Sequence, residues 1–209
     1  MVTLFIAIIG IASATASETE FEKSMLKGIE KLTVSSTVEA STEVTNYFVR
    51  LSEINKGEWL PLYYAAYSSL KAGFQQEESE KKDGLYMQGL EYIRRANTIK
   101  PEHSEILTME AYLKLMYISN AAMTRAPTQT GEAIELLEKA KALDPSNPRP
   151  WFVHGQNTLF TPAFFGGGEK NAKPLLEKAM SLYKSQKTAS TIMPAWGKER
   201  CEKLLEKCQ

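Results

Sequence analysis

The sequence predicts an all-α fold: a short right-handed solenoid of antiparallel helix pairs with a C-terminal capping helix. Three observations predict it. Apolar residues recur three or four positions apart along most of the chain, which is the spacing of one helix face. No segment alternates apolar and polar residues for long enough to indicate a strand. A pattern of large and small residues, which we call the lattice, occurs three times along the chain. Each occurrence predicts a helix pair, and such a pair buries its apolar face only by stacking on its copies.

Composition limits the partners that the chain can have. It has 209 residues, with 25 Lys plus Arg and 25 Asp plus Glu. A neutral chain offers no electrostatic reason to bind nucleic acid or an acidic bilayer surface, because both need an excess of positive charge. The two cysteines, Cys201 and Cys208, are seven positions apart on an expected helix. That spacing is about 10.5 Å of rise, too far for a disulfide within the helix, and small buried apolar residues are expected there.

The N-terminus has the pattern of a secretory signal. Residues 2–12 are an apolar run, residues 13–17 are small, and the first charged side chain is Glu18. The run is shorter than the roughly 20 residues that cross a bilayer, which argues against the alternative of a membrane anchor. We expect a signal peptide at 1–16, a helical-repeat domain at 17–209, and a periplasmic or secreted protein without a stable membrane span after cleavage.

Each helix is placed by its apolar period and its breaks. The first helix lies around 21–32, and Ser36 or Thr37 can cap a second one that ends near Asn55. Pro101 and Pro145 end helices because proline disfavours helix at the residue before it. Segments 77–83 and 126–131 lack an apolar period and are expected to be a charged linker and a loop. The remaining helices are expected over about 58–75, 84–99, 104–123, 132–143, 151–160, 169–183 and 194–207.

The lattice has a mechanical reason. Small residues let paired helices approach closely, and large ones fill the space between their ridges. The positions that carry the repeat are Trp59, Ala96, Pro101, Ala133, Ala140, Pro145, Trp151, Gly155, Ala172 and Ala179.

These residues resemble the tetratricopeptide repeat over roughly 58–184, because that family has Trp, Leu, Gly and Tyr in one helix and spaced alanines before a proline in the next. The resemblance implies a scaffold that binds a peptide or protein. The chain departs from the family in spacing: Pro101 and Pro145 are 44 positions apart, where the family repeats every 34 or so. We expect the extra residues to project from one edge, between the helices of a pair.

A second resemblance is to the T component of TRAP-type transporters, which is a periplasmic helical-repeat protein. An aromatic-glycine element at 164–168 precedes a helix with spaced alanines, and Pro194-Ala195-Trp196-Gly197 precedes the last helix. This resemblance implies the alternative function of an accessory subunit in solute uptake, with a pore or closed pocket between the repeats.

The residues that could carry chemistry do not form a catalytic set. The glycines at 166–168 could bind an anion at a helix start, but no strand or Walker lysine accompanies them, and a tight turn with positive φ is the better interpretation. His103 and His154 are the only histidines, and neither belongs to a nucleophile motif or has metal-ligand spacing. We expect no enzyme, no cofactor and no metal.

Tyrosines concentrate on two of the expected first helices, over about 58–75 and 104–123. By the geometry that the resemblance implies, the concave face would be lined by Tyr64, Tyr67, Tyr112, Gln156 and Asn157. Tyrosine suits a binding surface because it combines apolar area with a polar tip. The alternative is that these rings are part of the packed core. The leading hypothesis is an exported, non-enzymatic scaffold that binds a peptide or protein partner on this face.

Overall fold

The computed structural model of the protein describes residues 8–186 and 192–208, with side chains from residue 20 onward. This part of the chain is helical throughout, apart from turns and one short extended segment, and it holds no strand. The α-helices are α1 (Ile8–Val34), α2 (Val38–Ile54), α3 (Leu60–Gln75), α4 (Ser79–Ile99), α5 (Ser104–Ser119), α6 (Ala122–Leu143), α7 (Arg149–Phe160), α8 (Glu169–Ser185) and α9 (Lys198–Glu206), with a 3₁₀ turn η1 (Ala163–Phe165) between α7 and α8.

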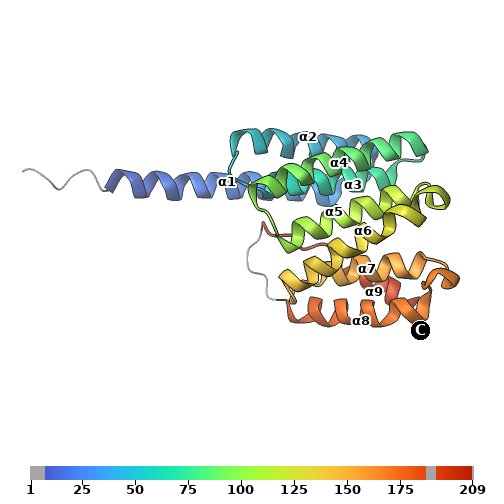
Figure 1. Cartoon of the computed structure of the whole chain (residues 1–209). Coiled ribbons are helices and arrows are strands. Elements are labelled where there is room, and N and C mark those ends of the chain that lie inside the picture. Colours follow the sequence, from blue (N-terminus) through green and yellow to red (C-terminus); the bar gives the residue numbers. More distant parts are fainter. Residues whose placement is uncertain (1–7, 187–191, 209) are drawn as a thin grey trace, which may run out of the picture.

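The helices stack in chain order as antiparallel neighbours (Figure 1). The connections α3–α4, α5–α6 and α7–α8 all lie at one end of the stack, which we call the loop end. Helix α9 packs against α8 and α7. The predicted all-α fold, built of antiparallel pairs and finished by a C-terminal helix, is confirmed.

The predicted signal peptide at 1–16 is only partly described, and residues 8–16 form the start of α1. Residues 1–7 of the expected signal peptide lie outside the described residues, and the side chains up to residue 19 are not described either. Among the helices that the structure describes, none combines the length and the apolar character needed to cross a bilayer.

The lattice of small residues lies where helices touch. Ala133, Ala140, Ala172 and Ala179 are fully buried. A Cβ added at Gly155 would be 2.8 Å from the side chain of Leu176, so the backbone of α7 lies directly against α8. The two helix-ending prolines also act as predicted, since Pro101 follows the end of α4 and Pro145 the end of α6.

The extra residues are helical, so the predicted charged linker at 77–83 and loop at 126–131 were wrong. Helix α4 already begins at Ser79, within the expected linker, and α6 begins at Ala122 and contains Pro127. Arg125 fixes the first turn of α6, because its guanidinium pairs with Asp83 of α4 and lies 3.8 Å from the ring centroid of Tyr117. The inserted residues therefore lengthen α4 and α6, the second helices of the pairs α3–α4 and α5–α6.

The longer helices set the period of the solenoid. Tyr63 on α3 bonds to Glu105 on α5, 42 positions later, and Glu105 bonds to Arg149 on α7, 44 positions later. Side chains of α3, α5 and α7 that are about one repeat apart thus form rows across the stack. These rows carry the candidate site.

Candidate binding site

The face of α3, α5 and α7 that we call the inner face is crossed by the chain's own residues 192–197, which precede α9. The indole of Trp196 stacks on Tyr67 and Tyr112, with ring centroids 5.2 and 5.8 Å apart and interplanar angles of 23° and 26°. Its edge meets Phe152 at 6.2 Å. One side chain near the C-terminus thus joins three successive repeats.

A buried polar chain lies beneath this indole. Trp196 Nε1 donates to the hydroxyl of Tyr63 over 2.8 Å, and that hydroxyl donates to Glu105 over 3.1 Å. Arg149 Nε donates to both carboxylate oxygens of Glu105, at 2.8 and 2.9 Å. The Arg149 and Glu105 side chains are only 4% and 6% exposed. Burial alone would lower the pKa of Arg149, but the Glu105 carboxylate outweighs burial and raises it.

The backbone of residues 192–197 is also held by tyrosines. Tyr64 donates its hydroxyl hydrogen to the carbonyl of Ile192 over 2.9 Å, and Tyr183 donates to the carbonyl of Trp196 over 3.1 Å. Gly197 has φ +105°, and a Cβ there would be 2.2 Å from the Tyr183 hydroxyl oxygen. Because this glycine turns the chain into α9, the last helix begins at Lys198 and not at Pro194 as predicted.

Four of the five residues predicted for the concave face come together here. Tyr67 and Tyr112 stack on Trp196, Tyr64 holds the segment's backbone, and Gln156 Nε2 donates to the Tyr112 hydroxyl over 3.1 Å. Burial raises the pKa of Tyr112 to about 12. Asn157 does not join them: within the described part of the chain its half-buried side chain forms no hydrogen bond.

The sequence argument did not identify Glu105, Arg149 or Trp196. A signal for the first two was available, because opposite charges stand 44 positions apart in equivalent parts of the repeat. Trp196 was noted only as part of a resemblance, and nothing in its local pattern indicates that it returns to α3 and α5.

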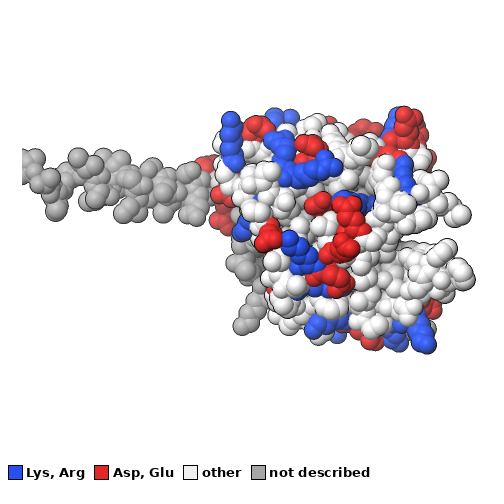
Figure 2. Space-filling model, viewed as in Figure 1, with Lys and Arg blue, Asp and Glu red and all other residues white. Residues whose placement is uncertain are grey.

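Helix α7 runs from this cluster of aromatic and polar side chains to the loop end. Phe160 follows Gln156 by one helical turn and is 61% exposed, while Phe164 and Phe165 of η1 are 92% and 75% exposed. Figure 2 shows the α7–α8 connection as a protrusion free of charged side chains. A cavity of about 380 Å³ opens here between the end of α7, the start of α8 and the end of the chain. It is lined by Leu159, Phe160, Gly168, Glu169 and Lys207.

The loop that carries these rings is internally bonded. Gly166 and Gly168 have φ of +81° and +90°, as the triple glycine predicted. The Gly168 N–H donates to the carbonyl of Thr158 over 2.9 Å, and Asn171 Nδ2 donates to the carbonyl of Gly166 over 3.0 Å. A Cβ at Gly167 would lie 1.9 Å from the carbonyl oxygen of Thr161, so only glycine fits. The phenylalanines are therefore presented by a defined turn.

A second cavity, of about 400 Å³, lies between α1 and α2. Its lining residues are Lys31, Val34, Ser35, Ala40, Glu43, Val44, Asn46, Tyr47 and Arg50. Both cavities are at the margins of the stack, and neither lies between the repeats, where the T-component interpretation expects a pocket.

Two histidines and two cysteines are the other residues that could carry chemistry. His103 stacks on Trp59, with ring centroids 4.5 Å apart, and both cysteines are buried and free, as the spacing predicted. In residues 8–186 and 192–208, no three His, Cys, Asp or Glu side chains are grouped as a metal site.

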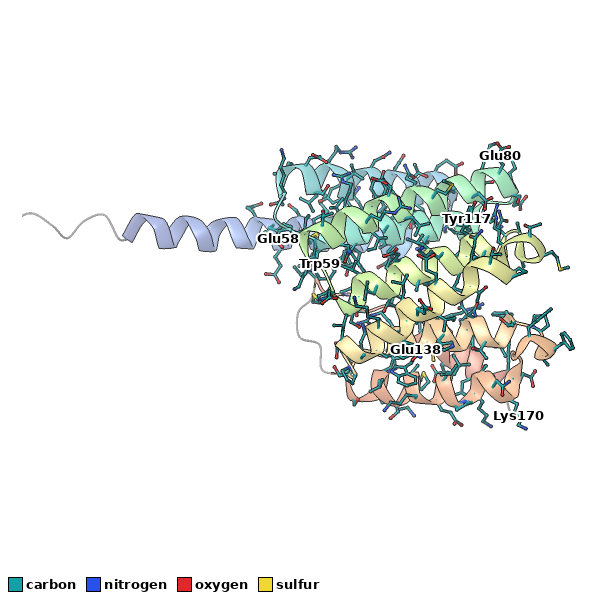
Figure 3. All side chains as sticks on the ribbon, in the orientation of Figure 1. Glu58, Trp59, Glu80, Tyr117, Glu138 and Lys170 are labelled. Carbon is teal, nitrogen blue, oxygen red and sulfur yellow. The ribbon has the colours of Figure 1, made fainter. Side chains whose placement is uncertain are left out.

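His154 belongs to a charged cluster between α6 and α7 (Figure 3 labels Glu138). Lys141 Nζ is 2.8 Å from His154 Nδ1, 2.7 Å from the Glu138 carboxylate and 4.3 Å from the ring centroid of Trp151. Burial, followed by the charge of Lys141, lowers the pKa of His154, although Glu138 acts in the opposite direction. Burial lowers the pKa of His103 as well. Both imidazoles are therefore neutral in the folded protein near pH 7.

We expect stability to fall as the pH is lowered from about 7.5 to 5.5. The unfolded chain binds protons on its histidines near pH 6.5, and the folded chain resists them to a lower pH, so acid favours unfolding in this window. Urea midpoints measured across the window test this. A His154→Gln variant should lose part of the slope, whereas an unchanged slope in that variant would assign the effect to other groups. Glu110, whose pKa burial raises, acts in the opposite direction at lower pH.

Comparison with known proteins identifies a similar solved structure. No family model matches the chain, and no curated protein matches it. Among solved structures, it is similar to the HusA haemophore from Porphyromonas gingivalis, with a TM-score of 0.81 and 25% identity. The match covers 90% of this chain and 92% of that one. The likeness extends over most of the chain, and the resemblances to tetratricopeptide repeats and to the T component stay predictions.

Proposed function

We propose that this protein is an exported, non-enzymatic binding protein whose cargo is a flat, largely apolar molecule of the porphyrin class. The cargo would bind in the loop-end cavity, against Phe160. The observation that carries the proposal is a cavity lined by the exposed Phe160, with two further exposed phenylalanines, Phe164 and Phe165, on the turn that follows α7. Exposed apolar groups gathered in one place usually mark a binding site.

The residues present fit such a cargo. The cavity, at about 380 Å³, is within the range of about 300–1,000 Å³ that ligand sites occupy. Aromatic side chains stack on flat ring systems, and the ammonium group of Lys207 in the lining could pair with a carboxylate of the cargo. A haemophore with the same helical architecture makes haem the first ligand to test.

Export rests on the sequence alone. We propose that residues 1–16 are removed as a signal peptide, because an uncharged apolar run followed by small residues is the pattern of such leaders. N-terminal sequencing of the protein recovered outside the cytoplasm tests this. A mature chain that starts at or near Ser17 supports the proposal, and one that keeps its first residues contradicts it.

The peptide or protein partner predicted from the sequence would need a free inner face. In this structure, Trp196 and its neighbours already contact Tyr64, Tyr67 and Tyr112. A partner there would have to displace them. The loop end is accessible without such a change, so the proposed cargo is assigned to it.

Titration with haem tests the proposal, with Soret absorbance and the thermal midpoint as independent readouts. Saturable binding should weaken about tenfold or more in Phe160→Ala, because burial of a phenyl ring contributes about 1.5–3 kcal/mol and 1.4 kcal/mol is a factor of ten. The matched control is Ile54→Ala, an exposed apolar residue of α2 far from the loop end, which should bind like the parent. Equal affinities in both variants, or no saturation at all, would contradict the site.

A further inference from the structure

The indole of Trp196 occupies a site built for a flat ring. Tyr67 and Tyr112 come from different repeats, yet both lie within 26° of parallel to the indole. Phe152 closes the edge, at 6.2 Å. Three repeats thus shape one ring site, defined here by Tyr67, Tyr112 and Phe152.

The polar atoms beside this ring site do not match its present occupant. Arg149 is 3% exposed and its guanidinium carbon is 5.9 Å from the Trp196 ring centroid, yet its Nη1 has no hydrogen-bond partner among the described residues. Gln156 is 6% exposed and bonded to Tyr112 through Nε2, and its Oε1 also lacks a partner there. Buried polar atoms are normally bonded, so an unmatched donor and acceptor at one site need an explanation. The indole, whose one donor is used by Tyr63, can satisfy neither.

An occupant with the complementary groups would differ from indole in a definite way. It would be planar, to lie against the two tyrosines, and it would carry a carboxylate or a similar acceptor for the cationic Arg149. Hydrogen bonds between ionised groups are about twice as strong as neutral ones. A ring that also carries a donor could satisfy Gln156.

We propose that the inner face holds a second binding site, for a planar aromatic acid, and that Trp196 is the resident group that fills it in the free protein. The tethered indole competes with any ligand at an effective concentration of about millimolar, so binding to the intact chain requires residues 192–197 to be displaced. The proposal does not depend on the loop-end cavity, and haem titration does not test it.

Removal of the resident ring gives the first test. In Trp196→Gly, indole should raise the thermal midpoint saturably, because it matches in size and shape the ring that the substitution removes. Indole-3-carboxylate should bind about tenfold more tightly than indole, given the added charge-assisted bond to Arg149. Cyclohexanecarboxylate, which has the acid but no flat ring, should bind more weakly than indole-3-carboxylate.

The control variant is Leu176→Ala, which opens an apolar cavity between α7 and α8, away from Arg149. Any binding there should show no preference for the carboxylate. A folded Trp196→Gly variant that gains no stability from either indole would overturn the ring site. Equal affinity for indole and its acid would overturn the role of Arg149.

The intact protein gives a second test that does not depend on the variant folding. The chain has three tryptophans, so 5-fluorotryptophan labelling gives three ¹⁹F signals, and Trp196→Phe identifies the one of interest. High concentrations of indole-3-carboxylate should move the Trp196 signal and leave those of Trp59 and Trp151 in place. A Trp196 signal that stays fixed at millimolar acid would contradict displacement.

Discussion

Glu105→Ala is expected to destabilise the protein by about 3–5 kcal/mol, measured as the free energy of unfolding in urea. The substitution leaves Arg149 buried and charged, without the carboxylate that Nε and Nη2 contact. It also removes the acceptor of the Tyr63 hydroxyl, which in turn holds the Trp196 indole. A loss of this size is a large share of the stability of a domain.

Two further variants separate the buried charge from a general loss of packing. Replacing both partners, as in Glu105→Met with Arg149→Leu, should recover much of the stability, because apolar pairs often substitute for buried ion pairs. Glu53→Gln breaks an exposed pair with Arg95 and should cost about 0–1 kcal/mol. If the double variant were no more stable than Glu105→Ala, the unpaired charge would not be the cause.

Leu176→Ala is expected to cost about 2–5 kcal/mol through loss of buried contacts and the cavity left behind. Leu176 is fully buried, and it lies directly over Gly155, the one position of α7 without a side chain. The two residues form one contact in the lattice, in which a large side chain fills the space that a small one leaves.

A double-mutant cycle tests that pairing. Gly155→Ala alone should be destabilising, because its Cβ would be 2.8 Å from Leu176 and 3.3 Å from Leu175 Cβ. In the Leu176→Ala background the same methyl enters the new cavity, so the two effects should be non-additive by about 0.5–3 kcal/mol. Additive losses would show that the helices shift apart and do not pack as a fixed pair.

The packing of helix pairs could be predicted because burial dictates residue size. Ala133 and Ala172 are small where helices meet, and that restriction leaves a period in the sequence whatever the rest of the chain does. The starts of α4 and α6 could not be predicted in the same way. Their first turns extend beyond their neighbours and need no apolar stripe, and the contact that holds them, between Asp83 and Arg125, joins residues 42 positions apart.

Only the part of the candidate site that follows from the repeat period could be predicted from the sequence. Tyr67, Tyr112 and Gln156 are 45 and 44 positions apart on α3, α5 and α7, close to the 44 positions between Pro101 and Pro145, so their place on one side of the stack follows approximately from the period. Asn157 follows Gln156 by one position, and one helical residue turns a side chain by about 100° away from that face. What fills the face depends on the path of residues 192–197, which no local pattern determines.

The two cysteines offer a way to time the release of α9. Cys201 is fully buried and burial raises the pKa of its thiol to about 12, and burial raises that of Cys208 too. Alkylating reagents attack the thiolate, which is scarce under these conditions. Reaction therefore requires α9 to detach from α8. The rate of iodoacetamide labelling then reports how often α9 detaches. Ligands that displace Trp196 should raise the labelling rate of these cysteines, whereas cargo bound in the loop-end cavity should lower it.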